Sequence, residues 1–129
     1  FIISADMAHA YHPSYPDRFD QNHRLFLNGG LVIKENADDR YATSGYSGAI
    51  IKGICEAADV PVQKFVNRQD IGCGSTIGPL LAANLNCHTV DVGTAMWAMH
   101  SSAETMGSED LYFASKAFHT FFSGCYIAD

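Results

Sequence analysis

The stretch Leu31-Val32-Ile33-Lys34, taken together with residues 44–58 and with Val62-Gln63-Lys64-Phe65-Val66, decides the fold. The first and last of these segments are short and rich in β-branched or aromatic residues, which is typical of strands. The segment between them has the residue spacing of an amphipathic helix. A strand, a helix and a second strand in succession predict an α/β layer fold.

The helix expected over residues 44–58 carries signals at both ends. Ser44 is a suitable N-cap residue, and Pro61 stops the helix soon after Asp59. The predicted apolar stripe consists of Tyr46, Ile50, Ile54 and Ala58, supported by Ala49 and Ala57.

The flanking sequence continues this alternation. Residues 1–5 and 88–92 predict two more strands, and residues 76–85 predict a short helix after a glycine-rich turn. The polar, turn-rich residues 10–30 predict a long ordered loop of the kind that often carries function.

The clearest helix lies near the end of the chain, where Ser108-Glu109-Asp110 forms an N-terminal signature. Its apolar positions are Leu111, Ala114, Phe118, Phe121 and Phe122. Ser101-x-x-Glu104 predicts a capping box for a shorter helix just before it. No internal repeat or linker interrupts the sequence, so we expect residues 1–129 to form one continuous unit.

Composition narrows the function classes. Hydrophobic residues make up 47% of the 129 residues, which is enough for a core, and the net charge of −6 argues against non-specific nucleic-acid binding. No apolar run approaches the ~20 residues that span a membrane.

The four cysteines lie at wide spacings with no Cys-x-x-Cys pair, so we expect reduced thiols in a cytoplasmic protein, with two disulfides as the alternative. The start, Phe1-Ile2-Ile3, has no initiator Met and indicates a fragment rather than a processed terminus.

Two residues stand where chemistry is expected. Asp6 follows a predicted buried strand, and ligands of open α/β sheets bind at strand ends. His100 comes where an apolar strand is expected to give way to a helix. Carboxylate oxygen and imidazole nitrogen are both zinc ligands. Each residue taken alone fits a capping aspartate or a structural histidine better.

Other polar groups have similar alternatives. Lys34 ends an apolar strand and would suit recognition of an acidic substrate side chain, although a solvated lysine is commoner there. The turn Gly72-Cys73-Gly74-Ser75-Thr76 offers amides and hydroxyls to an anion or a peptide backbone, or is simply a tight turn. We expect His23, His88 and His119 to be surface or half-buried residues.

The order and spacing of several motifs are specific where the single residues are not. These motifs are Ser4-Ala5-Asp6-Met7-Ala8-His9-Ala10, His12-Pro13, Asn22-His23-Arg24, Gly30-Leu31-Val32-Ile33-Lys34, Tyr41-Ala42-Thr43-Ser44, Gly72 to Pro79 and Ala98-Met99-His100-Ser101. In this order they resemble the aspartyl aminopeptidase family along nearly the whole chain.

The resemblance implies an α/β/α sandwich zinc-exopeptidase domain with a mixed central sheet, of which residues 1–129 would be the C-terminal portion. It implies two zinc ions, or other divalent metals, and removal of N-terminal Asp or Glu from peptides. Asp6 matches a non-bridging aspartate ligand and His100 a histidine ligand. The first histidine, the bridging aspartate and the general-base glutamate would lie upstream, so no catalytic residue is expected in this segment.

The remaining roles that the resemblance implies concern substrate and assembly. Lys34 would pair with the acidic substrate side chain, and His9, Gly74, Ser75 and Thr76 would line the cleft. His12 would support the site or the assembly, which is expected to be a homo-oligomer and in this family a dodecamer. Two alternatives stay open: a non-catalytic assembly fragment, and a related enzyme that acts on neutral N-terminal residues.

Overall fold

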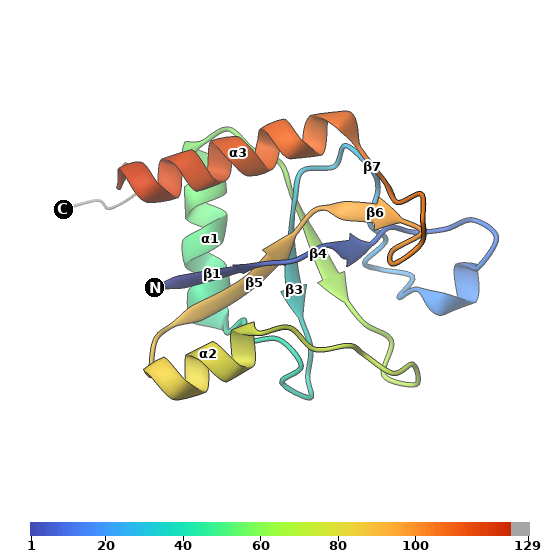
Figure 1. Ribbon diagram of the computed structural model, residues 1–129, viewed down its shortest axis with the longest axis horizontal. Helices are drawn as coiled ribbons and strands as arrows, with labels where there is room; N and C mark the ends of the chain where they lie inside the picture. The colour runs from blue at the N-terminus through green and yellow to red at the C-terminus, as the bar shows by residue number, and fades with distance from the viewer. Residues whose placement is uncertain (125–129) are drawn as a thin grey trace.

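A computed structural model describes residues 1–124, which contain a mixed four-stranded sheet (Figure 1). Its strand order is β1 (Ile2–Ala5), β5 (Thr89–Gly93), β3 (Leu31–Glu35) and β4 (Val62–Val66). β1 runs parallel to β5 and β3 runs parallel to β4, whereas β3 and β5 are antiparallel. The predicted strands and the mixed sheet are therefore confirmed.

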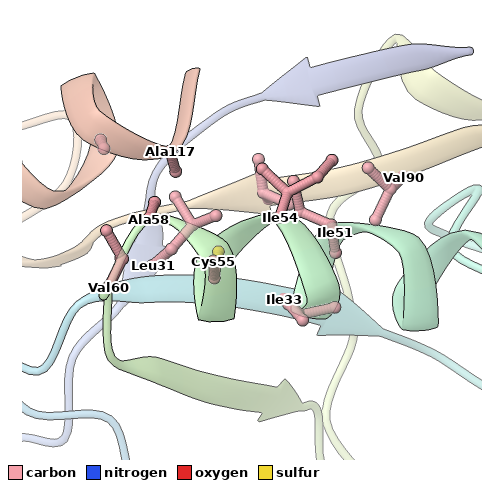
Figure 2. Close-up of a cluster of buried hydrophobic side chains, with 11 residues drawn as sticks. Leu31, Ile33, Ile51, Ile54, Cys55, Ala58, Val60, Val90 and Ala117 are labelled. Atoms are coloured by element: carbon pink, nitrogen blue, oxygen red, sulfur yellow. The ribbon is translucent and has the colours of Figure 1, made fainter. Parts of the chain in front are cut away.

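Two helices, α1 (Gly45–Ala57) and α3 (Ser108–Ser123), cover one face of this sheet (Figure 1). The core beneath them is formed by alternate residues of the two central strands together with residues from both helices (Figure 2). Leu31 and Ile33 of β3 and Val90 and Val92 of β5 point into this core. The residues between them in sequence therefore point to the opposite face.

The opposite face is covered by α2 (Gly78–Leu85) and by the long loop of residues 10–30. Gly78, at the start of α2, lies against the side chain of Asp91, which alternates with Val90 and Val92 in β5. The loop is ordered, as predicted, and includes a 3-10 turn η1 (Pro16–Arg18). A second apolar cluster lies here, made of Ala8, Ala10, Leu25, Val32, Tyr41, Phe65 and Ala95.

The helix α1 begins as expected, and most of its predicted stripe faces the core, because Ile54 and Ala58 are buried and Ile50 packs against them. Ser44 accepts a hydrogen bond from the Ser47 amide at 3.1 Å, and the Ser47 hydroxyl accepts one from the Ser44 amide at 2.9 Å. The prediction that Tyr46 lies on the buried stripe is wrong, because its side chain is 60% exposed. Ala49 and Ala57 are also exposed. Ser47, Ile51, Ile54 and Cys55 are the buried positions of this helix.

The helix α3 is fixed at its start by a buried carboxylate. Asp110 accepts hydrogen bonds from the amides of Asn28 at 2.7 Å and Gly30 at 3.0 Å. Of the predicted apolar stripe, Ala114 is buried, but Leu111 and Phe122 are 66% and 84% exposed. None of the helices within residues 1–124 combines the length and apolar character needed to cross a membrane.

A small second sheet was not predicted. It contains β2 (Ala8–His9), β6 (Ala95–Trp97) and β7 (Thr105–Met106), with β6 in the centre. The helix expected after Ser101 is wrong, because residues 98–104 form turns without a helix. The Glu104 carboxylate instead accepts a hydrogen bond from the His100 amide at 2.7 Å. Strands of two or three residues are too short for a period of two to be visible in the sequence.

Candidate active site

The first element of the candidate site is the end of β1. The Asp6 amide donates to the Val92 carbonyl at 2.9 Å, which keeps the chain beside β5 for one residue beyond the strand. Asp6 Oδ1 accepts a hydrogen bond from the Met7 amide at 2.9 Å, while the side chain as a whole is 60% exposed. A Cβ atom on Gly93 would collide with the Asp6 carbonyl oxygen, so only glycine permits this approach of β5. The sheet therefore holds Asp6 in a defined place with its carboxylate accessible.

Lys34 is the second element, and its environment differs from the solvated alternative. Its side chain is 2% exposed, and its Nζ lies 3.3 Å from Asp6 Oδ2. The Nζ also lies 5.4 Å from the centre of the Tyr41 ring. Burial lowers the pKa of Lys34, whereas the negative charge of Asp6 raises it. The buried carboxylate of Asp91 raises the pKa of Lys34 as well. A buried ammonium among carboxylates is a common feature of functional sites.

His100 is held in a turn after β6 by a left-handed backbone, with a φ of 69°. Ala98, two residues earlier, has a φ of 57°. This region is uncommon for residues other than glycine and costs about 1–2 kcal/mol per residue. Backbone strain of this kind concentrates at functional sites. The turn presents an exposed imidazole three residues after β6, whose first two residues are buried.

The His9 imidazole interacts electrostatically with Asp6, Lys34 and His100. It lies in β2, opposite Met96 of β6. Desolvation by the surrounding chain lowers the pKa of His9, and the positive charges of His100 and Lys34 lower it further, while Asp6 opposes the shift. Asp6, Lys34 and His100 therefore lie within electrostatic range of the His9 imidazole, although Lys34 and His100 are distant from it in the sequence.

A metal ion would need more donors than this group offers. Within residues 1–124, no cluster of three or more His, Cys, Asp or Glu side chains is arranged to hold a metal. The Asp6 carboxylate and the His100 imidazole suit zinc by donor type and by exposure. Two donors are fewer than the four that a zinc ion usually takes.

The glycine-rich turn is tied to the sheet by Asp91, a residue that the sequence analysis did not single out. Asp91 is fully buried in β5. Its Oδ1 accepts a hydrogen bond from the Thr76 hydroxyl at 2.6 Å, and its Oδ2 accepts one from the Ala42 amide at 2.7 Å. The signal for it was a carboxylate inside the apolar run of residues 89–93. Ser75 donates its hydroxyl to the Arg40 carbonyl at 3.1 Å, and Gly74 is exposed.

The remaining histidines occupy different surroundings. The His12 ring lies 5.3 Å from Tyr15 and 6.0 Å from Trp97, and its Nδ1 accepts a hydrogen bond from the Ser14 amide. His23 is half-buried, with its Nδ1 2.7 Å from Asp20 Oδ1. His88 and His119 are exposed, as expected.

Two cavities adjoin His9. One has a volume of about 320 Å³ and reaches from His9 and His23 to Arg68 and Gly72. The other has a volume of about 410 Å³ and lies between the loop of residues 10–30 and the residues that lead to His100. The candidate site is therefore open on the side of the long loop.

Comparisons with known proteins agree with one another. Residues 1–122 match the family model described as Aminopeptidase I zinc metalloprotease (M18). A probable M18 family aminopeptidase 2 of Pseudomonas aeruginosa PAO1 is 48% identical over 122 residues, covering 95% of this chain and 28% of that protein. A probable aspartyl aminopeptidase of Ricinus communis is 47% identical, covering 95% of this chain and 25% of that protein.

Solved structures show the same likeness. The structure titled as the Ape4 and Nbr1 complex matches with a TM-score of 0.91 and 45% identity, over 98% of this chain and 25% of that chain. The S. cerevisiae mApe1 dodecamer matches with a TM-score of 0.85 and 30% identity, over 97% of this chain and 27% of that chain. This chain thus spans little more than a quarter of the length of the relatives that it matches. On the family model and these identities, the chain belongs to the M18 family of aminopeptidase I zinc metalloproteases.

Proposed function

We propose that this chain is the C-terminal portion of the catalytic domain of a zinc-dependent aminopeptidase that removes N-terminal Asp or Glu from peptides. The observation that carries the substrate preference is the buried Lys34 ammonium, 3.3 Å from the Asp6 carboxylate. Membership of the family and the likeness to a probable aspartyl aminopeptidase support the reaction type.

The argument for Lys34 is one of charge balance. A buried lysine needs an anion close by, because the desolvation cost of the ammonium is otherwise several kcal/mol. Asp6 supplies that anion, yet in this proposal Asp6 also donates its carboxylate oxygen to zinc. Asp91 also stabilises the ammonium, but it is fully buried and makes hydrogen bonds to Thr76 and Ala42. A carboxylate at the first side chain of the substrate would replace the charge that Asp6 shares with zinc. Neutral N-terminal residues would leave the ammonium undercompensated, which favours Asp and Glu.

The other residues have positional roles in this proposal. Asp6 and His100 each contribute one donor, Asp6 as a non-bridging ligand. Two zinc ions, when bound, supply Lewis-acid polarisation of the scissile carbonyl and a water of lowered pKa. The general base for that water would be a glutamate from the upstream part of the catalytic domain. His9 lines the cleft beside Asp6, Lys34 and His100, and Asp91 holds the turn of Gly74, Ser75 and Thr76 against the sheet.

The test uses the full-length protein and the variant Lys34→Met. We expect kcat/KM for an N-terminal Glu substrate to fall at least about 10-fold, which corresponds to about 1.4 kcal/mol. The value for an N-terminal Leu substrate should stay nearly constant. Lys64→Met is the matched control, because Lys64 is an exposed strand lysine paired with Glu35 at 2.7 Å. Equal losses with both substrates would remove Lys34 as the selectivity residue, and efficient Leu hydrolysis by the wild type would favour the enzyme for neutral residues.

The proposed role of His100 as a metal ligand is tested by measuring zinc content rather than the rate of turnover. His100→Ala should reduce the zinc content of each subunit in the purified full-length protein. The control is His88→Ala, since His88 is exposed and contacts the Tyr46 ring instead. Unchanged zinc content in His100→Ala would remove His100 from the metal site.

We extend the proposal to assembly and location. A homo-oligomer is expected because a relative of 30% identity was solved as a dodecamer. His12, between Tyr15 and Trp97, is the residue to which we assign a supporting or assembly role. Cys55, Cys73 and Cys87 are free thiols, which supports a cytoplasmic location. Analytical ultracentrifugation of the full-length protein tests the assembly.

A further inference from the structure

The cavity of about 410 Å³ next to His9 has the chemistry of a binding site for one part of a peptide. One wall comes from Met96, Trp97, Ala98 and Met99, and the last two of these directly precede His100. The other wall comes from the loop of residues 10–30, which lies beside β6 (Figure 1). The cavity therefore lies beside the residues that lead to His100, one of the two proposed metal ligands.

The apolar wall is held in place before any ligand binds. The Trp97 indole Nε1 donates a hydrogen bond to the Tyr11 carbonyl at 3.0 Å, and its ring lies 6.0 Å from His12. The Ala10 amide donates to the Met96 carbonyl at 2.8 Å, which ties the loop to β6. An indole fixed at both its polar and apolar edges is a rigid surface for a large apolar or aromatic side chain.

A cation stands at the edge of the same cavity. Arg18 lines it, and within residues 1–124 its guanidinium takes part in no ion pair. Arg68, in the neighbouring cavity, is instead paired with Asp70. A guanidinium binds a carboxylate through two parallel hydrogen bonds. Arg18 is thus an available partner for a carboxylate beside an apolar wall.

We infer that this cavity binds the leaving residue of a dipeptide substrate, with its side chain on Trp97 and Met99 and its free carboxylate on Arg18. This inference rests on the proposed function and goes beyond it, because it concerns the residue after the scissile bond. The full-length enzyme would prefer dipeptides whose second residue is large and apolar. It would discriminate against the same dipeptide when its carboxylate is capped as an amide.

Three substrates distinguish the contact with Trp97 from the contact with Arg18 in the full-length protein: Asp-Phe, Asp-Ala and Asp-Phe amide. Trp97→Ala should lower kcat/KM about 10-fold for Asp-Phe and leave Asp-Ala nearly unchanged. Arg18→Gln should lower it about 10-fold for Asp-Phe and leave the amide nearly unchanged. The matched control is Arg24→Gln, because Arg24 lies in the same loop but packs on the Tyr11 ring 4.7 Å away.

A binding measurement gives a second readout. Titration calorimetry with free phenylalanine, the product of Asp-Phe, should detect binding to the wild type and its loss in Arg18→Gln. Equal losses for all three substrates in both variants, or unchanged phenylalanine binding in Arg18→Gln, would overturn the inference. Dissociation of the oligomer by Trp97→Ala would also overturn it and make this face a subunit interface. Failure of the wild type to cleave any Asp dipeptide contradicts the proposed function, while phenylalanine binding still tests the cavity.

Discussion

The ammonium of Lys34 and the carboxylate of Asp6 lie 3.3 Å apart, although Lys34 is 2% exposed and the Asp6 side chain is 60% exposed. The pair joins the middle of the sheet to its accessible edge, because Lys34 is in β3 and Asp6 follows β1. Because Lys34 is buried, breaking the pair should lower the stability of the fold as well as alter substrate binding.

Asp6→Asn is expected to destabilise the metal-free full-length protein by about 1–3 kcal/mol, because Lys34 loses its anionic partner while staying buried. The double variant Asp6→Asn with Lys34→Met should recover part of this loss, since no buried ammonium is left without its partner. Chemical denaturation of the wild type, both single variants and the double variant measures the coupling. A double variant as unstable as the sum of the single variants would show that the two side chains do not interact.

Gly93→Ala is expected to destabilise the protein by about 1–3 kcal/mol, because the new Cβ atom would collide with the Asp6 carbonyl oxygen. The displacement of Asp6 should also reduce zinc content. The control is Gly53→Ala in α1, where no heavy atom lies within 4 Å of the added Cβ. That substitution should stabilise the helix by about 0.5–1 kcal/mol. A Gly93→Ala protein with unchanged melting temperature would argue against the close approach of the two segments.

Asp91→Asn should destabilise the protein by about 1–3 kcal/mol, although it keeps the size of the side chain. Both carboxylate oxygens accept hydrogen bonds, from the Thr76 hydroxyl and from the Ala42 amide. An amide side chain has only one oxygen acceptor, so one of these donors loses its partner. Thr76→Val removes the hydroxyl alone and should cost less. Limited proteolysis within residues 70–78 checks whether the glycine-rich turn loosens in Asp91→Asn, and equal protection of wild type and variant would contradict this role.

Cys55 provides a prediction about pH. Burial raises the pKa of this thiol from 9.0 to about 11. A raised folded-state pKa stabilises the fold below the unfolded value, and this contribution is lost as the pH rises from 9 to about 11. The wild type should therefore lose stability relative to Cys55→Ala across this window. Thermal unfolding of both proteins between pH 8 and pH 11 measures the difference.

The same burial predicts slow alkylation of Cys55. With iodoacetamide at pH 8, the half-buried Cys87 should be modified in the native protein while Cys55 stays unmodified. Peptide mass mapping before and after denaturation reports each site. Equal modification of the two cysteines in the native state would contradict the burial of Cys55.

The sequence by itself determined the main elements and the order of the functional motifs. Residues 31–34, 44–58 and 62–66 formed the expected strand, helix and strand because their apolar spacing and end signals agree with one another. It also placed Asp6 at the end of a strand and His100 after an apolar strand, because both positions follow from the neighbouring residues in the sequence. It did not determine that Tyr46 is exposed and that Ile51 and Cys55 are buried, although Ile54 and Ala58 of the predicted stripe do lie in the core.

Only the tertiary structure decided the surroundings of the polar residues. Lys34 is buried because β3 is a central strand and Tyr41 covers it from the second apolar cluster, and neither fact is local to residues 31–34. The partners of Asp91 lie 15 and 49 residues away, so no short motif reveals them. The second sheet is also beyond local sequence, since strands of two or three residues exist through hydrogen bonds to distant segments rather than through their own preference. Hydrophobic spacing acts over a few residues, whereas the burial of charge depends on all the segments that meet at one point.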